Sequence, residues 1–429
     1  MLPSSARVNG SRLWDSIEIS SSIGRKGSGL GRLALSDDDK QMRDRFVEWC
    51  VQAGLTIEVD ALGNTFARRD GVDNELPAVM FGSHLDSQQE GGRFDGVLGV
   101  LGTLEVVRTL NELDYRTRRP LQIVNWTNEE GARFPPPMLG SGCFAGAYDL
   151  DWAYAIESTD DGRSVRQELN RIGYLGSASL NRELIDSYFE LHIEQGPRLQ
   201  KLHTQIGVVS GAAMVHGFKI EYIGETAHAG TRPMTLRKNA LVAAARLAAA
   251  IDDIGIQHGA EGGMATTARI AAVPNKPGIL SNYCEIVGDV RHPDPATADS
   301  MIFEVELAAR AAAETTHTNF TFADRWDWGG AIFDDEAVET VRVSVHGLGY
   351  SFTDISSQAG HDAYFMARLC PTAMIFVPCV DGITHHPAER IAIDDSSAGA
   401  NVLLHSVVAR ADRYGSGATE EGTRGKGIN

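Results

Sequence analysis

Residues 77–86, PAVMFGSHLD, contain the pattern that decides the fold: a short apolar run followed at once by polar side chains. The run at 77–82 shows no alternation of polar and apolar residues, which is typical of a strand buried on both faces of a mostly parallel sheet. A second such run, at 121–126, precedes Asn128, Glu129 and Glu130, and the segment 96–110 between the two runs is predicted to be a helix. This order of strand, helix and strand predicts an α/β sheet whose ligand site lies beyond the carboxyl ends of its strands.

From about Ser210 the pattern changes to that of a smaller domain. Strands are predicted at 218–223, 265–273, 284–290 and 319–324, with helices at 239–251 and 296–314. Two helices against about four antiparallel strands form an α+β unit of the ferredoxin-like type. The α/β pattern returns after Trp328, with a helix at 336–348 and a strand at 373–378. We therefore expect a discontinuous larger domain over 1–209 and 329–429, an inserted domain over 210–328, and a disordered tail over 415–429.

Composition excludes several classes of function. The chain has 429 residues, 43% of them hydrophobic, and a formal net charge of -18. A strongly acidic surface repels phosphate backbones, so nucleic acid is not expected as a partner. The longest apolar stretch, 96–104, is too short to cross a bilayer, and the amino terminus lacks the pattern of a secretory signal. We expect a cytoplasmic protein without membrane association, in which the five cysteines are buried free thiols.

Five segments each offer a metal-ligand side chain at a strand end or in a tight loop. They are GSHLD with His84, GGRFDG with Asp95, TNEEG with Glu129 and Glu130, ELHIEQG with His192, and GITHHP with His385. Imidazole and carboxylate ligands together suit two divalent cations per subunit, Zn²⁺ or else Mn²⁺, Co²⁺ or Ni²⁺. Any one of these histidines taken alone is more often a hydrogen-bonded polar residue, and a bare Glu-Glu pair is more often an exposed turn. The five segments together are far more specific.

The chemistry of amide hydrolysis explains this set of residues. Two cations about 4 Å apart lower the pKa of a water molecule, bridge the resulting hydroxide and polarise a carbonyl group. Asp95 is predicted to be shared between the cations, because the glycines around it let the backbone approach closely. His84 and His192 would complete one cation site, and Glu130 and His385 the other.

Two neighbouring carboxylates have separate predicted roles. Glu129 points away from Glu130 and would reach the bridging water as general base. Asp86 would accept the second N–H group of the His84 imidazole and fix its tautomer.

These motifs resemble those of the M20 family of dinuclear metallopeptidases, over roughly residues 14–410. The similarity is greatest to its amidase branch of N-carbamoyl-L-amino acid hydrolases, β-ureidopropionases and allantoate amidohydrolases. It rests on GSHLDSQQEGGRFDGVLGV, TNEEGARF, ELHIEQGP, AHAGTRPM and GHDA. The resemblance implies the same metal ligands, Glu129 as base, hydrolysis of an N-carbamoyl-L-amino acid to the amino acid, CO2 and NH3, and a homodimer whose inserted domain dimerises and closes over the substrate.

The resemblance also implies residues that bind a small ureido or N-acyl amino acid. His228 would donate a hydrogen bond to the transition state in the partner subunit, and Arg291 would hold the substrate carboxylate through a bidentate fork. Gln195 would contact the ureido group, and His361 would line the floor of the pocket or support the cations. A solvated loop histidine and a surface salt bridge are the alternative readings of His228 and Arg291.

The chain departs from the amidase branch at two places. That branch usually has Asn-Val-x-Pro-Gly before the Asp-x-Arg strand, whereas residues 276–283 here read KPGILSNY. Asn282 or Asn275 would have to replace the substrate-binding asparagine, and spacing does not choose between them. Gln358 stands where glycine is common. Hydrolysis of allantoate, or of another ureido or N-acyl amino acid, is therefore kept as an alternative, and a metal-free binding protein as a second one.

Overall fold

The computed structural model describes residues 2–413, which form two compact units. Of the described residues, unit 1 comprises 2–209, 333–354 and 361–413, and unit 2 comprises 210–332 and 355–360. Unit 2 thus includes residues 329–332 and 355–360. The sequence predicts that both segments belong to the larger domain. The tail expected to be disordered, 415–429, lies outside the described residues.

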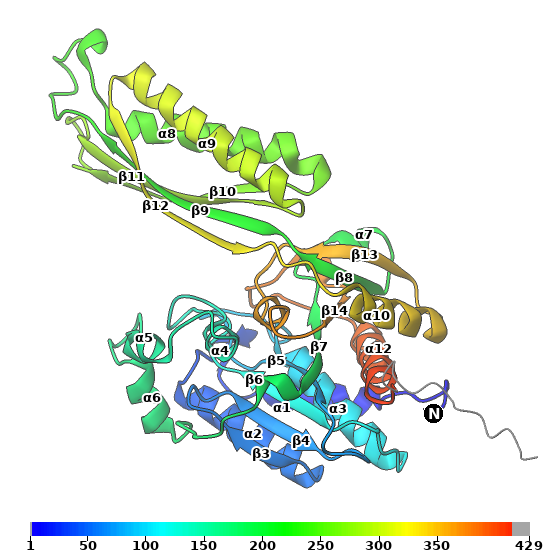
Figure 1. The fold of residues 1–429 in the computed structure, drawn as a ribbon. Coiled ribbons are helices and arrows are strands. Elements are labelled where there is room, and N and C mark those ends of the chain that lie inside the picture. The colour runs from blue at the N-terminus through cyan, green and yellow to red at the C-terminus, as the bar shows by residue number, and fades with distance from the viewer. Residues whose placement is uncertain (1, 414–429) are drawn as a thin grey trace, which may run out of the picture. The chain divides into compact units, whose positions relative to one another are not determined.

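Unit 1 is built on an eight-stranded sheet in the order β13-β8-β14-β7-β5-β6-β4-β3 (Figure 1). The strands β14, β7, β5 and β6 are parallel to one another, while β8 is antiparallel to β14, β4 to β6, and β3 to β4. The strands are β3 (Thr56–Val59), β4 (Thr65–Arg69), β5 (Ala78–His84), β6 (Leu121–Trp126), β7 (Ile185–Ile193), β8 (Ile206–Ala212), β13 (Phe352–Ser357) and β14 (Thr372–Val377). Every residue of β5, β6 and β14 is buried, as the unbroken apolar runs predict.

Helices cover this sheet, and their ends follow from local sequence. The longer ones are α1 (Gly10–Ser20), α2 (Asp37–Gln52), α3 (Val97–Glu112), α6 (Val165–Ile172), α10 (Asp335–Leu348) and α12 (Ile393–Ala411). Short helices occur at α4 (Leu139–Phe144), α5 (Leu150–Ala155), α7 (Arg198–Lys201) and α11 (Ala363–Met366), and a small ribbon is formed by β1 (Arg25–Lys26) and β2 (Gly29–Leu30). The Ser36 side chain caps α2 by accepting from the Asp39 N–H group, and three aspartates in the first turn suit the helix dipole.

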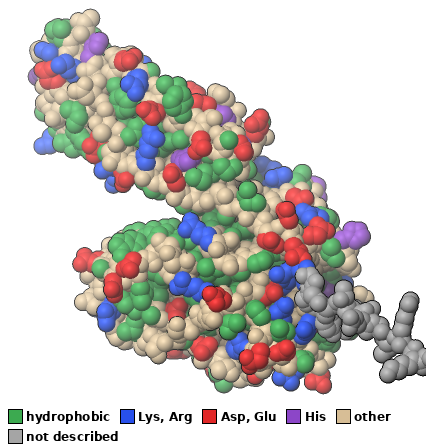
Figure 2. All heavy atoms as spheres, in the orientation of Figure 1, with side chains coloured by type: hydrophobic (Ala, Val, Ile, Leu, Met, Phe, Trp, Pro, Cys, Tyr) green, Lys and Arg blue, Asp and Glu red, His purple; other side chains and the backbone are tan. Residues whose placement is uncertain are grey.

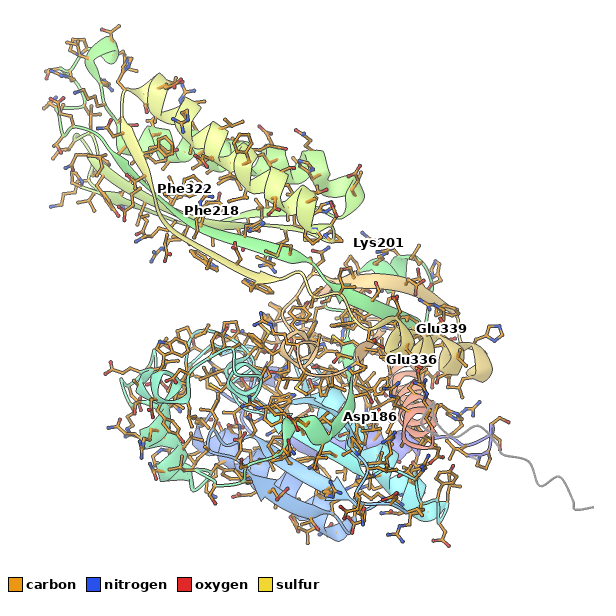
Figure 3. All side chains as sticks on the ribbon, in the orientation of Figure 1. Asp186, Lys201, Phe218, Phe322, Glu336 and Glu339 are labelled. Atoms are coloured by element: carbon orange, nitrogen blue, oxygen red, sulfur yellow. The ribbon has the colours of Figure 1, made fainter. Side chains whose placement is uncertain are left out.

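Unit 2 has the predicted βαββαβ order. Its strands are β9 (Met214–Ile223), β10 (Met264–Val273), β11 (Tyr283–His292) and β12 (Asn319–Gly329), and its helices are α8 (Ala240–His258) and α9 (Pro295–Thr316). The four strands are antiparallel in the order β10-β11-β9-β12. Phe218 on β9 is fully buried beneath the helices, and Phe322 on β12 packs against the same core (Figure 3). The fold class, a mostly parallel sheet with an inserted α+β unit, is confirmed.

The surface carries acidic and basic side chains interspersed with apolar ones on the face drawn in Figure 2. Among the described residues, no helix combines the length and apolar character needed to cross a bilayer. All five cysteines are free, and four of them are buried while Cys143 is half-buried.

Candidate metal centre

Asp95 lies in unit 1 at the centre of the predicted ligands, in the loop that leads into α3. The next residue, Gly96, has a left-handed backbone with φ of +66°, and a Cβ atom there would lie 2.4 Å from the His84 ring. Only glycine lets the backbone pass this close to the imidazole. The glycines around Asp95 therefore mark the close approach that the sequence predicts.

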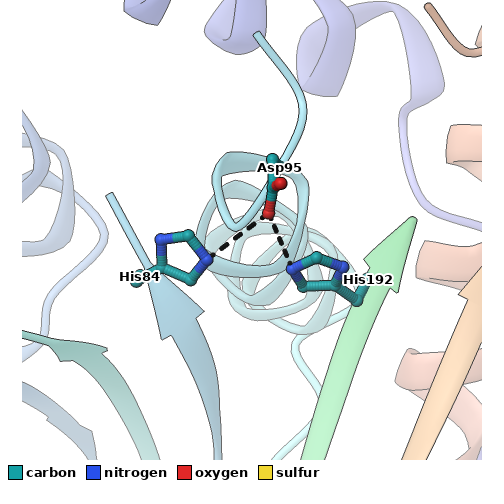
Figure 4. A group of neighbouring side chains, drawn as sticks. All are labelled: His84, Asp95 and His192. Atoms are coloured by element: carbon teal, nitrogen blue, oxygen red, sulfur yellow. Dashed lines mark ion pairs between the residues drawn. The ribbon is translucent and has the colours of Figure 1, made fainter. Parts of the chain in front are cut away.

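One oxygen of Asp95 faces two buried histidines (Figure 4). Asp95 Oδ1 lies 3.1 Å from Nε2 of His192 and 3.6 Å from Nε2 of His84. His84 is the last residue of β5 and His192 lies near the end of the neighbouring parallel strand β7, so the sheet brings both rings to one edge. This first group of ligand atoms is enclosed, since all three side chains are buried.

The other oxygen of Asp95 faces a second group on the more exposed side. Asp95 Oδ2 lies 3.3 Å from Nε2 of His385, and the same nitrogen lies 3.2 Å from Oε2 of Glu130. Glu130 follows β6, while His385 comes from the loop after β14 and is 47% exposed. Asp95 is thus the one side chain common to the two groups of possible ligands.

The spacing of these atoms fits divalent cations. Bonds of about 2.0–2.2 Å from zinc to nitrogen or oxygen place two ligands of one tetrahedral ion roughly 3.3–3.6 Å apart. Two of the four separations above, 3.3 and 3.6 Å, lie within that range, and the other two, 3.1 and 3.2 Å, are slightly shorter.

Backbone contacts orient the two buried imidazoles. Nδ1 of His84 lies 3.0 Å from the carbonyl oxygen of Asp86, and Nδ1 of His192 lies 2.9 Å from that of Ile193. These carbonyls can only accept, so both rings carry a proton on Nδ1, and Nε2 is the atom of each ring that faces Asp95 and would bind a cation. The donor set is therefore ready for a cation at both rings.

Asp86 acts differently from the sequence prediction. Its carboxylate lies 3.7 Å from His84 Nδ1, so the backbone carbonyl of the same residue, and not the side chain, fixes the tautomer. The buried carboxylate instead accepts from the N–H groups of Glu129 and Glu130, at 3.3 and 3.2 Å. Asp86 therefore positions the turn that carries both glutamates.

Glu129 and Glu130 point to different parts of the site. Oε2 of Glu129 lies 3.6 Å from Nε2 of His84, whereas Glu130 faces His385 and accepts 2.7 and 3.2 Å hydrogen bonds from Gln88. Burial raises the pKa of Glu129 well above its usual range, although the nearby His84 ring opposes this shift. In contrast, three histidines hold the pKa of Asp95 well below its usual range in spite of burial.

Two side chains that support the site, those of Glu389 and Thr384, are not predicted from the sequence. Glu389 is buried and accepts from the N–H groups of Phe94 and Asp95, at 2.9 and 3.1 Å, and from Thr384 at 3.1 Å. The Thr384 hydroxyl also lies 3.1 Å from Asp95 Oδ2, so its single hydrogen can go to either carboxylate. The only local signal was an acidic residue four positions after His385, which is too common a spacing to single out.

Glu190 forms a support beneath the first group. It lies close enough to His192 and His361 to make a third possible cation site. However, its two oxygens already accept from the hydroxyl groups of Ser83 and Tyr188 and from the Ala363 N–H group, at 2.8 to 3.1 Å. These bonds link the strand that ends in His84 to the segment that carries His361.

The two remaining unit 1 predictions lie beside the ligands. Gln195 donates to Asp95 Oδ2 at 2.8 Å, so its amide contacts the shared carboxylate. His361 is buried against His192, with ring centroids 4.5 Å apart. Burial and the positive potential of His192 lower the pKa of His361 well below its usual range.

The other predicted residues belong to unit 2. His228 lies in an exposed loop, where its Nδ1 accepts from the N–H groups of Gly230 and Thr231, at 3.0 and 3.2 Å. Arg291, on β11, donates to the Asp289 carboxylate at 2.7 and 3.2 Å and to the Gln358 carbonyl at 2.9 Å. Asn282 is exposed, and its backbone carbonyl accepts from the Gly224 N–H group at 2.7 Å.

Comparison with known proteins gives consistent similarities over nearly the whole chain. The model of Peptidase family M20/M25/M40 matches residues 80–409. An N-carbamoyl-L-amino-acid amidohydrolase of Rhizobium meliloti is 41% identical over 409 residues, covering 95% of this chain and 97% of the relative. A ureidoglycolate hydrolase of Arabidopsis thaliana is 32% identical, covering 94% of this chain and 87% of the relative. The crystal structure of a hydantoinase/carbamoylase family amidase from Burkholderia multivorans superposes with a TM-score of 0.87 at 41% identity, covering 95% of this chain and 99% of that one.

Proposed function

The chain belongs to peptidase family M20/M25/M40, and from this premise we propose that it hydrolyses the linear amide of an N-carbamoyl-L-amino acid. One water molecule is consumed, and the products are the amino acid, CO2 and NH3. The observation that carries the proposal is the placement of Asp95, whose two oxygens face two separate groups of ligand atoms. The relatives named N-carbamoyl-L-amino-acid amidohydrolase, at 32 to 41% identity, support this substrate class.

Each group of ligand atoms would hold one divalent cation, Zn²⁺, Mn²⁺, Co²⁺ or Ni²⁺. His84 and His192 would serve one cation, Glu130 and His385 the other, and Asp95 both. Such cations supply Lewis acidity, which lowers the pKa of water and polarises a carbonyl group. Among the ligands, only His385 is substantially exposed, so substrate would enter from its side.

Glu129 would move the proton. Its carboxylate belongs to neither group of ligand atoms, and it lies 3.6 Å from His84 on the enclosed side. It would take a proton from the attacking water as the new C–O bond forms, and give it to the departing nitrogen as the C–N bond breaks. The carbamate that is left would then decompose, so each turnover yields one amino acid, one CO2 and one NH3.

His228 would donate a hydrogen bond to the substrate carbonyl. Since two backbone N–H groups point at its Nδ1, the neutral ring must carry its proton on Nε2, which makes Nε2 a donor. We propose that this donor acts in the partner subunit of a homodimer. A mixture of inactive His228→Ala chains with inactive Glu129→Gln chains should then regain partial activity, because mixed dimers contain one intact combination; absence of any recovery would oppose a shared site.

Arg291 would bind the substrate carboxylate with those guanidinium N–H groups that do not donate to Asp289. Asn275 and Asn282 are both exposed, so both stay candidates for contact with the ureido group. The Arabidopsis relative named ureidoglycolate hydrolase favours a second candidate function, hydrolysis of another ureido acid such as allantoate.

A substrate panel tests the proposal. Metal-reconstituted protein would be assayed with N-carbamoyl amino acids, allantoate, ureidoglycolate, and N-formyl and N-acetyl amino acids, and both ammonia and amino acid would be measured. We expect equal amounts of the two products from N-carbamoyl substrates. Glu129→Gln should keep its metal yet lose about 10²–10⁴-fold in turnover, the usual contribution of a general base. Turnover of allantoate or ureidoglycolate alone would favour the second candidate, and near-normal activity of Glu129→Gln would remove Glu129 from its role.

A further inference from the structure

A hollow of about 540 Å³ in unit 1 lies behind the loop that carries Asp95. Its walls include Glu18 near the end of α1, the turn with Arg25 and Ser28, and the neighbouring residues Glu389 and Arg390. Arg93 also lines it, from the loop that carries Asp95, which we call the metal loop. The Ser28 hydroxyl donates to the Pro387 carbonyl at 3.1 Å, which ties two of these walls together. We call this region the arginine hollow.

The arginine hollow holds positive charge that carboxylates do not balance. Within the described residues, Arg25 and Arg390 have no carboxylate within ion-pair distance, and the Arg25 side chain donates only to the Gly27 carbonyl at 3.1 Å. Arg93 is paired with both oxygens of Glu18, at 3.0 and 3.1 Å. Both guanidinium groups are exposed to solvent, so an anion that enters the hollow can reach them.

Glu389 does not neutralise the two free arginines. Its carboxylate turns toward the metal loop, where it accepts hydrogen bonds from the N–H groups of Phe94 and Asp95 and from Thr384. A Cβ atom on Gly92 would collide with that carboxylate at 1.9 Å, so the loop fits tightly against it. Glu389 thus lines the hollow, but its oxygens are bonded to the loop that carries Asp95, and it forms no ion pair with Arg25 or Arg390 among the described residues.

We propose that the arginine hollow binds a phosphate group, either as free phosphate or as part of a phosphate ester, between Arg25 and Arg390. The planar fork of guanidinium donors matches the oxygens of phosphate and forms paired, charge-assisted hydrogen bonds with them. The volume admits a group larger than phosphate alone, which is why an ester is included. This inference goes beyond the proposed reaction and does not depend on it.

The position of the arginine hollow links such a ligand to the metal loop. Arg93 stands two residues before Asp95, and Arg390 directly follows Glu389, which holds the Asp95 N–H group at 3.1 Å. A phosphate bound here would restrain both segments that support the shared carboxylate. By thermodynamic linkage, a ligand that favours the ordered loop also raises the affinity of the loop for its cations.

Calorimetric titration of the metal-loaded protein with inorganic phosphate and with glycerol phosphate tests the proposal. Phosphate can also bind at a metal centre, so the comparison is with Arg25→Gln/Arg390→Gln, which leaves every predicted metal ligand intact. Arg166→Gln/Arg246→Gln is the matched control, because both of these arginines are exposed, lie outside the hollow and remove the same charge.

We expect wild type and control to share a phosphate site that is lost or weakened at least tenfold in Arg25→Gln/Arg390→Gln. Tighter binding of glycerol phosphate would identify an ester as the ligand. Tighter binding of inorganic phosphate would identify the free anion. Identical titrations of all three proteins, or equal weakening in both double variants, would overturn the proposal, because the phosphate would then bind only at the metals or through net charge. All three proteins would also be tested for loss of metal on dialysis with and without phosphate, where protection is expected only with Arg25 and Arg390 present.

Discussion

Replacing Asp86 by asparagine tests how the glutamate turn is held in place. The wild-type carboxylate is 1% exposed and accepts from the N–H groups of Glu129 and Glu130 with separate oxygens. Asparagine keeps one acceptor oxygen but turns an NH2 group toward the other N–H, which is then buried without a partner. Such a loss costs about 1–3 kcal/mol. At about 1.4 kcal/mol per factor of ten, kcat/KM should fall roughly 5-fold to 150-fold.

The assay compares kcat/KM and metal dissociation constants of wild type, Asp86→Asn and a matched control. Asp149→Asn is suitable because Asp149 caps α5 by accepting from the Trp152 N–H group, and asparagine caps helices equally well. We expect the control to behave as wild type and Asp86→Asn to bind the cation at Glu130 more weakly. Unchanged activity and metal affinity in Asp86→Asn would refute the inference that this carboxylate positions the glutamates.

Three further substitutions probe other parts of the account. Arg291→Lys should raise KM for substrates with a carboxylate while kcat changes less, because an ammonium group cannot form the fork; an unchanged KM would remove Arg291 from substrate binding. Arg43→Ala should cost about 3–5 kcal/mol, seen as a large fall in melting temperature, because Arg43 is fully buried and donates to Asp39 at 2.9 Å and to the Gly63 carbonyl at 2.7 Å. Burial lowers the pKa of His405 in the folded protein, so this imidazole binds a proton more readily in the unfolded chain. Protonation of His405 therefore lowers the free energy of unfolding as the pH falls below about 6.5. Melting curves of His405→Gln should therefore lose less stability than wild type between pH 7 and pH 5, and parallel curves would contradict this.

The convergence of the ligands could be predicted because it follows from sheet order. His84, the Glu129–Glu130 pair and His192 come from β5, β6 and β7, and these parallel strands are neighbours, with β5 in the middle. Parallel strands end at the same edge, so polar residues after buried runs meet there. The helices and strands of unit 2 also follow from periodicity, although β12 extends to Gly329 rather than to Asp324.

Other features depend on contacts between distant segments, which local patterns do not encode. Residues 355–360 group with unit 2, where the Gln358 carbonyl accepts a 2.9 Å hydrogen bond from Arg291, which is 67 residues away in the chain. Glu389 reaches the Asp95 loop across 294 residues. At Asp86 the backbone carbonyl, and not the predicted carboxylate, faces His84, since the path of the backbone decides which of the two groups lies beside the ring.

Anomalous diffraction from crystals of the zinc-loaded protein tests the central claim most directly. The account predicts two peaks per chain about 4 Å apart, one among His84, His192 and Asp95 and the other among Glu130, His385 and Asp95. A single peak, or peaks that do not share Asp95, would contradict it.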